Sequence, residues 1–383
     1  MDLHRQAGLY LHIPFCSRKC HYCSFFSFAP QPGDIAALVA SLHQQIEQTA
    51  RLPEMQDLVF ATFFVGGGTP SLLPVEVLAE LLAHCRRSYR WSEDEVEISI
   101  EVNPGTIDGQ GLAALRRAGF NRLSIGIQSL DDGELGRLGR IHNRAQALDC
   151  LHAARQAGFS NLSGDLMYGL PGQTTASWQQ TLEDLLACAP QHLSLYELTV
   201  EEGTALCAAV AGNPALLPSE EAVLEMMTIT QHLVDGGGWP RYEISNYARR
   251  GYQCRHNVNY WQNGSYLGLG PGAVSGLNGE RRAAVADLHQ YAQWVSRGQS
   301  VWEEVERLEP EAAFRETVVM GLRMIAGVSI SELHQRFAID LPSYYGAVFT
   351  RLVDEQLLIY SGDRIRLSSR GLALANRVMA ELV

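Results

Sequence analysis

Short apolar runs alternate with amphipathic stretches over the first 200 residues or so of the chain. The runs predicted as strands are Gly8–Ile13, Leu58–Val65, Val96–Glu101, Arg122–Ile127, Asn161–Met167 and His192–Leu198. The stretches predicted as helices between them include Ile35–Ala50, Pro74–Ser88, Gly109–Ala118, Arg144–Ala157 and Thr175–Ala187. Strands that alternate with helices are typical of βαβ units, so we expect an α/β fold with a parallel sheet.

The number of these repeats limits the architecture. Six βα units are too few for an eight-stranded barrel, and they favour a partial (β/α)6 TIM-like barrel. Chemistry in such barrels sits at the carboxyl ends of the strands. Candidate residues are therefore sought in the loops that follow each strand.

The chain changes character twice after this region. Residues 201–305 are predicted as a looser connecting region with one helix from about residue 219 to 234. Residues 306–383 show three compact helices, a short hairpin and a last helix, predicted at Phe314–Ala326, Ser329–Ala338, Pro342–Glu355, Leu357–Tyr360 with Ile365–Leu367, and Ser369–Leu382. Three helices and a hairpin resemble a winged helix. The expected domains are thus a barrel over 1–200, a connecting region over 201–305 and a winged-helix-like domain over 306–383.

Charge and composition exclude several classes of protein. The chain has 30 basic and 42 acidic residues, a net charge of −12, which disfavours a nucleic-acid partner. There is no run of about twenty apolar residues for a transmembrane segment, and the polar N-terminus lacks a signal peptide. Eight cysteines in 383 residues do not indicate a disulfide framework. We therefore expect a cytoplasmic protein.

Three cysteines follow the first predicted strand closely. Cys16, Cys20 and Cys23 form a C-x3-C-x2-C run in the loop that begins at Pro14. Three thiolates at this spacing can each bind one iron of a [4Fe–4S] cluster, which normally takes four cysteines. Phe25 occupies the place of a fourth cysteine, so one iron is left open for a small ligand. Zinc is the alternative, but zinc sites usually combine two C-x2-C pairs, and no second pair is present.

This loop resembles that of the radical S-adenosylmethionine (SAM) family, in which SAM completes the open iron. The segment after the second strand, Gly66-Gly67-Gly68-Thr69-Pro70, resembles the family's glycine-rich SAM contact, and its glycines permit close approach of a ligand. Further positions match SAM-binding residues of the family's coproporphyrinogen-oxidase-like branch: Tyr10, Glu101, Gln128, Arg140 and Asp165. Each taken alone could be a satisfied polar residue or, for Tyr10, a core aromatic. Their order along the chain after the cysteines favours a SAM site.

A second informative stretch lies in the connecting region. Cys254 and His256 precede Asn257, Tyr260 and Trp261 in a His-Asn-x-x-Tyr-Trp motif. Imidazole and thiolate are the usual axial ligands of haem iron, and aromatic faces suit a flat macrocycle. His256 is the first candidate haem-contacting residue and Cys254 the second, although a lone histidine is more often a satisfied core residue.

The whole chain resembles the oxygen-independent coproporphyrinogen III oxidase-like group, and within it the HemW haem-chaperone branch. That branch has the C-x3-C-x2-C-x-F form and the His-Asn-x-x-Tyr-Trp motif, whereas the true oxidases carry a fourth cysteine and an N-terminal extension. The resemblance implies a [4Fe–4S] cluster, SAM binding, haem as cargo, haem-accepting respiratory proteins as partners, and a homodimer. Val274 departs from the branch, which usually has histidine there.

Two other functions remain open at this point. One is a radical SAM oxidase that removes two propionate carboxyl groups from coproporphyrinogen III. The other is a different radical SAM modification of a tetrapyrrole, such as methylation or ring opening. The sequence does not distinguish productive SAM cleavage from SAM binding alone, so we make no prediction about enzymatic turnover.

Overall fold

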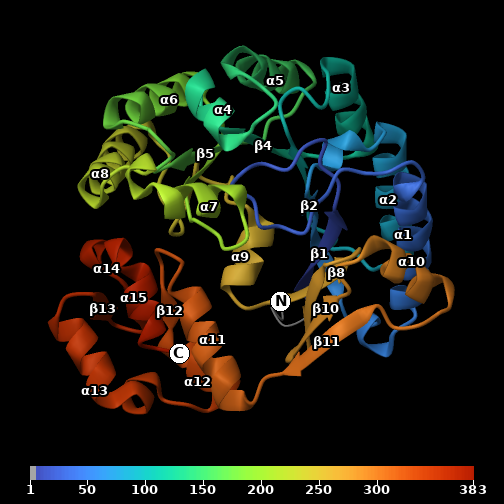
Figure 1. Ribbon diagram of the computed structural model, residues 1–383. Helices are drawn as coiled ribbons and strands as arrows, with labels where there is room; N and C mark the ends of the chain where they lie inside the picture. Colours follow the sequence, from blue (N-terminus) through green and yellow to red (C-terminus); the bar gives the residue numbers. More distant parts are fainter. Residues whose placement is uncertain (1–5) are drawn as a thin grey trace.

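A computed structural model describes residues 6–383 of the chain, and its centre is a curved parallel sheet (Figure 1). Six strands pair in sequence order and all in parallel, as the alternation of strands and helices predicts. Their bounds are β1 Gln6–Ile13, β2 Val59–Gly67, β3 Glu97–Val102, β4 Arg122–Gln128, β5 Leu162–Tyr168 and β6 His192–Glu197. The expected partial α/β barrel is confirmed.

Helices cover the outer face of this sheet (Figure 1). They are α1 Asp34–Ala50, α2 Val75–Ser88, α3 Gly109–Ala118, α4 Asp132–Leu138, α5 Arg144–Gln156 and α6 Thr175–Ala187, with short 3-10 turns η2 Pro53–Met55 and η3 Pro70–Leu72. Local signals set their ends: the Asp108 side chain accepts a hydrogen bond from Gly111 N, and Gly119 ends α3 in the left-handed conformation. Within residues 6–383 no helix combines the length and apolar character that crossing a bilayer requires.

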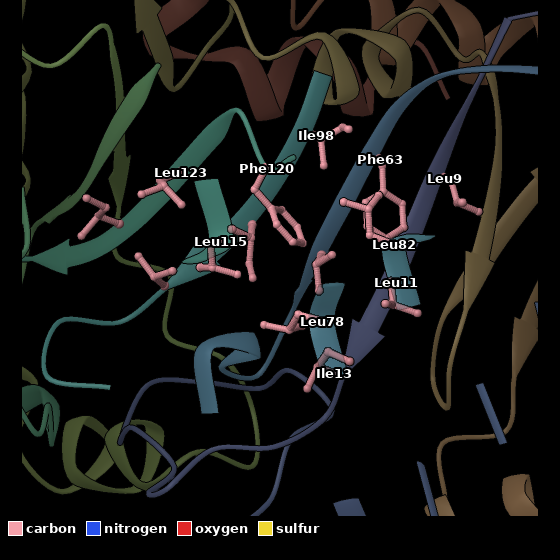
Figure 2. Packing of buried hydrophobic residues seen from close by; sticks show 14 of the residues in the cluster. Leu9, Leu11, Ile13, Phe63, Leu78, Leu82, Ile98, Leu115, Phe120 and Leu123 are labelled. Atoms are coloured by element: carbon pink, nitrogen blue, oxygen red, sulfur yellow. The ribbon is translucent and has the colours of Figure 1, made fainter. Parts of the chain in front are cut away.

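The main core fills the layer between the sheet and these helices. Figure 2 shows Leu9, Leu11 and Ile13 of β1 beside Leu78 and Leu82 of α2. All five side chains are almost fully buried. Each such side chain contributes roughly 1.5–3 kcal/mol on burial. This packing holds the strands rigidly, so the loops at their carboxyl ends have a fixed base.

The region expected as a looser connection is mostly ordered secondary structure. It contains α7 Ala205–Gly212, η4 Pro214–Leu216, α8 Glu220–Gly237, β7 Asn246–Ala248, α9 Arg255–Trp261, β8 Ser265–Leu269, β9 Val274–Leu277, β10 Glu280–Ala284, α10 Leu288–Ser296 and β11 Trp302–Arg307. These strands extend the sheet at both edges, in the order β11-β10-β9-β8-β1-β2-β3-β4-β5-β6-β7. β8 pairs in parallel with β1, so the chain returns to its own beginning.

The C-terminal part has its own hydrophobic core, which includes Phe314, Leu352 and Val378. Its elements are α11 Pro310–Gly321, β12 Val328–Ser329, α12 Ile330–Phe337, α13 Leu341–Asp354, β13 Leu358–Ser361, β14 Arg364–Leu367, α14 Ser369–Ala373 and α15 Ala375–Ala380. The expected last helix is two helices that meet at Leu374. Figure 1 shows the group beside the barrel, next to α9. Its likeness to a winged helix stays a prediction.

Candidate functional site

The cysteine loop leaves the carboxyl end of β1 and is pinned at both ends by the backbone. Cys16 N donates to Phe28 O at 2.9 Å, and Phe28 N donates to Pro14 O at 2.8 Å. His21 N donates to Leu138 O at 3.0 Å, which ties the middle of the loop to the end of α4. The loop is therefore a fixed platform above the sheet.

The three cysteine side chains of this loop are partly exposed and unbridged. Two hydrogen-bond donors point at their sulfur atoms: Thr69 Oγ1 lies 3.6 Å from Cys16 Sγ, and Arg140 Nη1 lies 3.6 Å from Cys20 Sγ. Within the described chain, no three His, Cys, Asp or Glu side chains converge on a single metal ion. A cubane cluster does not need such convergence, because each thiolate binds its own iron. The donor set fits three irons of a cluster.

The glycine-rich segment ends β2 directly beside this loop. Gly67 has φ +117°, and its N–H donates to Glu101 Oε2 at 3.1 Å. A Cβ atom at Gly68 would lie 2.5 Å from the Phe15 carbonyl oxygen, and one at Gly66 would lie 3.0 Å from Glu101 Oε2. Side chains at these positions would displace the cysteine loop or Glu101, so glycine is needed for the close packing here.

Two carboxyl groups face the same space from β3 and β5, the strands on either side of β4. Asp165 accepts hydrogen bonds from Ser163 Oγ at 2.8 Å and Ser124 Oγ at 2.9 Å. Burial raises the pKa of Asp165 to about 6, against the opposing effect of those two hydroxyls. Burial and the nearby Asp165 charge raise the pKa of Glu101 to about 7. A cationic ligand would favour the ionised form of both groups.

Arg140 connects the cysteines to the strand ends. Its Nη2 donates to Asn103 Oδ1 at 2.7 Å and to Gly126 O at 2.5 Å. Its buried Nε has no hydrogen-bond partner among residues 6–383. Gln128 has φ +68°, next to a shift in the register of β4 and β5, and its Oε1 accepts from Tyr196 OH at 2.8 Å. Such backbone strain in a non-glycine residue is typical of binding sites.

A cavity of about 370 Å³, here named the outer cavity, joins these groups. Most of the predicted metal-binding and SAM-binding residues line it: Cys16, Cys20, Cys23, Gly67, Gly68, Thr69, Glu101, Gln128, Arg140 and Asp165. The exposed side chains of Phe25 and Ile141 stand at the same cavity. Its volume lies in the range of small-molecule sites, about 300–1,000 Å³.

Tyr10 lies on a second, inner cavity of about 330 Å³ that begins deeper in the barrel. Its hydroxyl is 3.0 Å from His12 Nδ1, and burial followed by the Glu101 charge raises its pKa well above 10. Glu101 and Asp165 line both cavities. Tyr10 is not among the described residues that line the outer cavity, where the three cysteines lie.

His256 and Cys254 occupy the buried side of this inner region. His256 is 1% exposed, with Nδ1 2.7 Å from Thr62 Oγ1 and Nε2 2.9 Å from Tyr260 OH. Burial and the charge of Arg122 lower its pKa to about 3. Burial raises the pKa of Cys254 to about 12, and its thiol lies 3.6 Å from Glu97 Oε1. Both candidate haem ligands are engaged in contacts within the protein.

Val274, the position at which the resemblance predicts histidine, begins β9 and pairs with Ala283 of β10. It lies in the sheet extension, on the far side of β8 from β1. The effect of a valine here on haem binding stays a prediction, as do the haem contacts of His256 and Cys254.

Several residues of the outer cavity escaped the sequence analysis. Asn103 links Arg140 to Thr69, to which its Nδ2 donates at 2.8 Å, and Tyr196 bonds Gln128. Strand alternation was the available signal for Ser124, which lies two residues after Arg122 and therefore points to the same side of β4.

Comparison with known proteins identifies the family of the chain. The family model of the radical SAM superfamily matches residues 10–185, and that of the HemN C-terminal domain matches residues 308–374. Heme chaperone HemW of Bacillus subtilis (strain 168) is 32% identical over 96% of this chain and 97% of its own length. Radical S-adenosyl methionine domain-containing protein 1, mitochondrial, of Mus musculus is 36% identical over 99% of this chain and 87% of its own.

A solved structure shows the same fold over nearly the whole chain. Coproporphyrinogen III oxidase (HemN) from Escherichia coli superposes with a TM-score of 0.86 and 24% identity, covering 99% of this chain and 90% of that one. The sequence likeness to the chaperone group extends over both the barrel and the C-terminal part. This chain therefore belongs to the HemW family of the radical SAM superfamily.

Proposed function

We propose that this protein binds haem and delivers it to haem-dependent proteins, and that it carries a [4Fe–4S] cluster and binds SAM. The observation that carries the proposal is the match over 96% of the chain to a protein named heme chaperone HemW. Phe25 supports it, because the sequence resemblance associates this residue with the chaperone branch. The partners under this proposal are haem and the apo forms of haem proteins.

Each of Cys16, Cys20 and Cys23 would bind one iron of the cluster. When bound and reduced, the cluster supplies an electron that can cleave the sulfonium of SAM. Arg140 and Thr69 would direct N–H and O–H donors at the cluster-bound sulfurs, which tunes the reduction potential of such clusters. The fixed loop keeps the three thiols at one end of the outer cavity.

The remaining groups of the outer cavity would hold SAM. Asp165 and Glu101 present carboxylates on the cavity wall, where they would attract its positive charge and its hydroxyl and amino donors. The free Nε of Arg140 would pair with the SAM carboxylate. Gly67 and Gly68 would let the ligand approach the backbone closely.

Haem would meet the protein at the mouth of the outer cavity. Phe25 is 68% exposed and Ile141 is 49% exposed, and both line this cavity. Large apolar side chains that remain exposed beside a cavity mark a binding surface for an apolar ligand. The flat face of a tetrapyrrole fits such a pair.

One anaerobic experiment tests the proposal. Reconstituted protein with a full complement of iron and sulfide is mixed with haem and an apo-haem protein, and haem transfer is followed by absorption. A parallel sample receives SAM, a low-potential reductant and coproporphyrinogen III, and its tetrapyrroles are analysed by mass. We expect haem transfer and an intact coproporphyrinogen. Loss of two carboxyl groups with formation of 5′-deoxyadenosine would instead make the protein an oxidase.

A further inference from the structure

The inner cavity is a distinct space that adjoins the outer cavity. It shares five lining residues with the outer cavity, namely Phe25, Glu101, Ser124, Asp165 and Tyr196. Its other walls come from β1, β2, the starts of β4 to β6, β7 and α9: Tyr10, Phe64, Arg122, Ser163, His192, Ser194, Asn246, His256, Asn257 and Tyr260. A ligand seated in the outer cavity could extend an arm into it.

Arg122 is the unusual residue of this space. It is the first residue of β4, it is 2% exposed, and it lines the inner cavity. Its Nε and Nη1 are buried and lack any hydrogen-bond partner among residues 6–383. A buried charge whose N–H groups are not bonded is costly, so these two N–H groups favour an anionic ligand.

The neighbouring carboxylates are already committed to other groups. Asp165 accepts from Ser124 and Ser163. Glu97 accepts from the backbone N–H groups of Arg255 at 3.0 Å and His256 at 3.1 Å. These acids act on Arg122 only at longer range.

Glu101, the other carboxyl group on the wall of the inner cavity, accepts from Gly67 N–H at 3.1 Å. The two histidine side chains on this wall offer no negative charge. His192 is bonded to Ser163 Oγ at 2.8 Å and to Tyr242 OH at 2.9 Å. Burial, followed by the charge of Arg122, lowers the pKa of both His192 and His256, so both rings are neutral at pH 7. Burial opposes the charge of Arg122 itself, but Cys254, Glu97 and Tyr242 outweigh it and hold the Arg122 pKa above its ordinary value. The inner cavity thus has a permanent cation at one wall.

We propose that the inner cavity is a carboxylate-binding subsite in which Arg122 pairs, through Nε and Nη1, with a carboxylate of a ligand that occupies the outer cavity. Nε and one Nη form the fork that binds both oxygens of a carboxylate. Two sources share this chemistry, and both rest on the function proposed above: a propionate of a tetrapyrrole, and the amino-acid end of a SAM molecule, whose carboxylate would then pair with Arg122 in place of Arg140.

The test compares ligands with and without the carboxylate. Haem and its dimethyl ester, and separately SAM and decarboxylated SAM, are titrated anaerobically into the wild-type protein, Arg122→Gln and Arg144→Gln. Arg144 is the matched control, since it is an exposed arginine paired with Asp184 at 2.9 Å. We expect the wild type to prefer the carboxylate form of one ligand pair by roughly ten- to hundredfold. Arg122→Gln should lose that preference, and Arg144→Gln should keep it.

The outcomes distinguish the two sources of the carboxylate. They also distinguish a failure of the carboxylate subsite from a failure of the proposed function. Loss of the haem preference identifies a propionate, and loss of the SAM preference identifies the amino-acid end. Unchanged preferences for both pairs in Arg122→Gln would overturn the subsite and leave water as the partner of Arg122. Wild-type protein that fails to bind haem, with its cluster intact, would defeat the proposed function while the SAM pair still tests the subsite.

A second variant covers the case in which Arg122→Gln does not fold. Ser194 is half-buried on the wall of the inner cavity. Ser194→Leu fills part of the cavity and leaves Arg122 in place, so it should reduce the same carboxylate preference. A preference that survives in folded Ser194→Leu would count against the inner cavity.

Discussion

The cysteine loop and the segment from Cys254 to Tyr260 carry the same kinds of side chain in opposite settings. The loop presents partly exposed thiols on a cavity wall, with donors from Thr69 and Arg140 aimed at two of them. The later segment buries its cysteine fully and its histidine almost fully. Residue types alone made both look like metal sites, and the surroundings distinguish them.

The two segments differ in how far neighbouring groups of the protein already satisfy the hydrogen-bonding capacity of their side chains. The thiol of Cys254, whose pKa burial raises to about 12, stays protonated at neutral pH and donates towards Glu97. His256 uses both ring nitrogens within the fold. A group with its bonding capacity filled by neighbours holds the fold together, whereas a group with spare capacity on a cavity wall is available to a ligand.

The largest expected effect is that of removing one cysteine from the cysteine loop. Cys16→Ala should remove the absorption of the cluster from anaerobically reconstituted protein, because three irons would then have only two protein thiolates. The control is Cys207→Ala, a partly exposed cysteine on α7 outside the lining of both cavities as the described residues define them. A full content of iron and sulfide in Cys16→Ala would refute the assignment of the loop.

The second largest expected effect is a loss of stability when the segment from Cys254 to Tyr260 loses its contact with Glu97. Glu97 accepts from two backbone N–H groups at the start of α9 and from Cys254 Sγ. Glu97→Ala would leave these donors unpaired, and we expect the free energy of unfolding to fall by about 3 kcal/mol. Denaturant titration measures it, with the exposed Glu93→Ala as the control. Equal stability of the two variants would show that this segment is not anchored as described.

A third effect follows from the raised pKa values in the outer cavity. The pKa of Glu101 is about 7 against an ordinary 4.5, and that of Asp165 is about 6 against 3.8. The folded, SAM-free protein therefore binds more protons than the unfolded chain between these values. The stability that these two groups contribute is fully present below about pH 4 and is lost as the pH rises through 6 and 7.

SAM affinity should change in the opposite direction over the same range. Cationic SAM prefers ionised carboxylates, so its affinity should rise about tenfold from pH 5.5 to 8, which corresponds to about one pKa unit of linkage. Calorimetric titration at several pH values gives the profile, and Glu101→Gln should flatten it. A flat profile in the wild type would place the SAM charge away from these two groups.

The smallest effect sharpens the role of His256. Tyr260→Phe removes the hydroxyl at His256 Nε2, which should lower the free energy of unfolding by about 1 kcal/mol and leave the haem absorption spectrum unchanged. Tyr266→Phe, on the ring that packs edge-on against Tyr260, is the control. Tighter haem binding with a histidine-type spectrum in Tyr260→Phe would make His256 an iron ligand after all.

Much of the fold could be predicted because its signals are local. The predicted bounds of α3 and α6 agree with the structure, since caps at Asp108, Gly119 and Thr174 mark their ends. The pairing of β8 with β1 could not be predicted in this way. It joins short strands far apart in sequence, and the residue pattern of neither strand indicates which other strand it pairs with.

The residues of the site also differ in whether local sequence could indicate them. Contiguous motifs indicated the cysteines and Gly67, whereas Asn103 and Tyr196 acquire their roles only when Arg140 and Gln128 reach them across the barrel. Sequence pattern also gave Arg122 no distinction from any other strand residue. Its unpaired state depends on what the fold leaves out of its reach, which the sequence does not show.

The pairing of β1 with β8 also constrains the order in which the molecule can be completed. β1 is made first, but the strand that covers its second edge, Ser265–Leu269, is made after the whole barrel. A nascent chain released at residue 200 would hold every cysteine of the loop and yet expose an open edge of parallel sheet. During synthesis there is therefore a long stage in which the unpaired edge of β1 can aggregate with other chains.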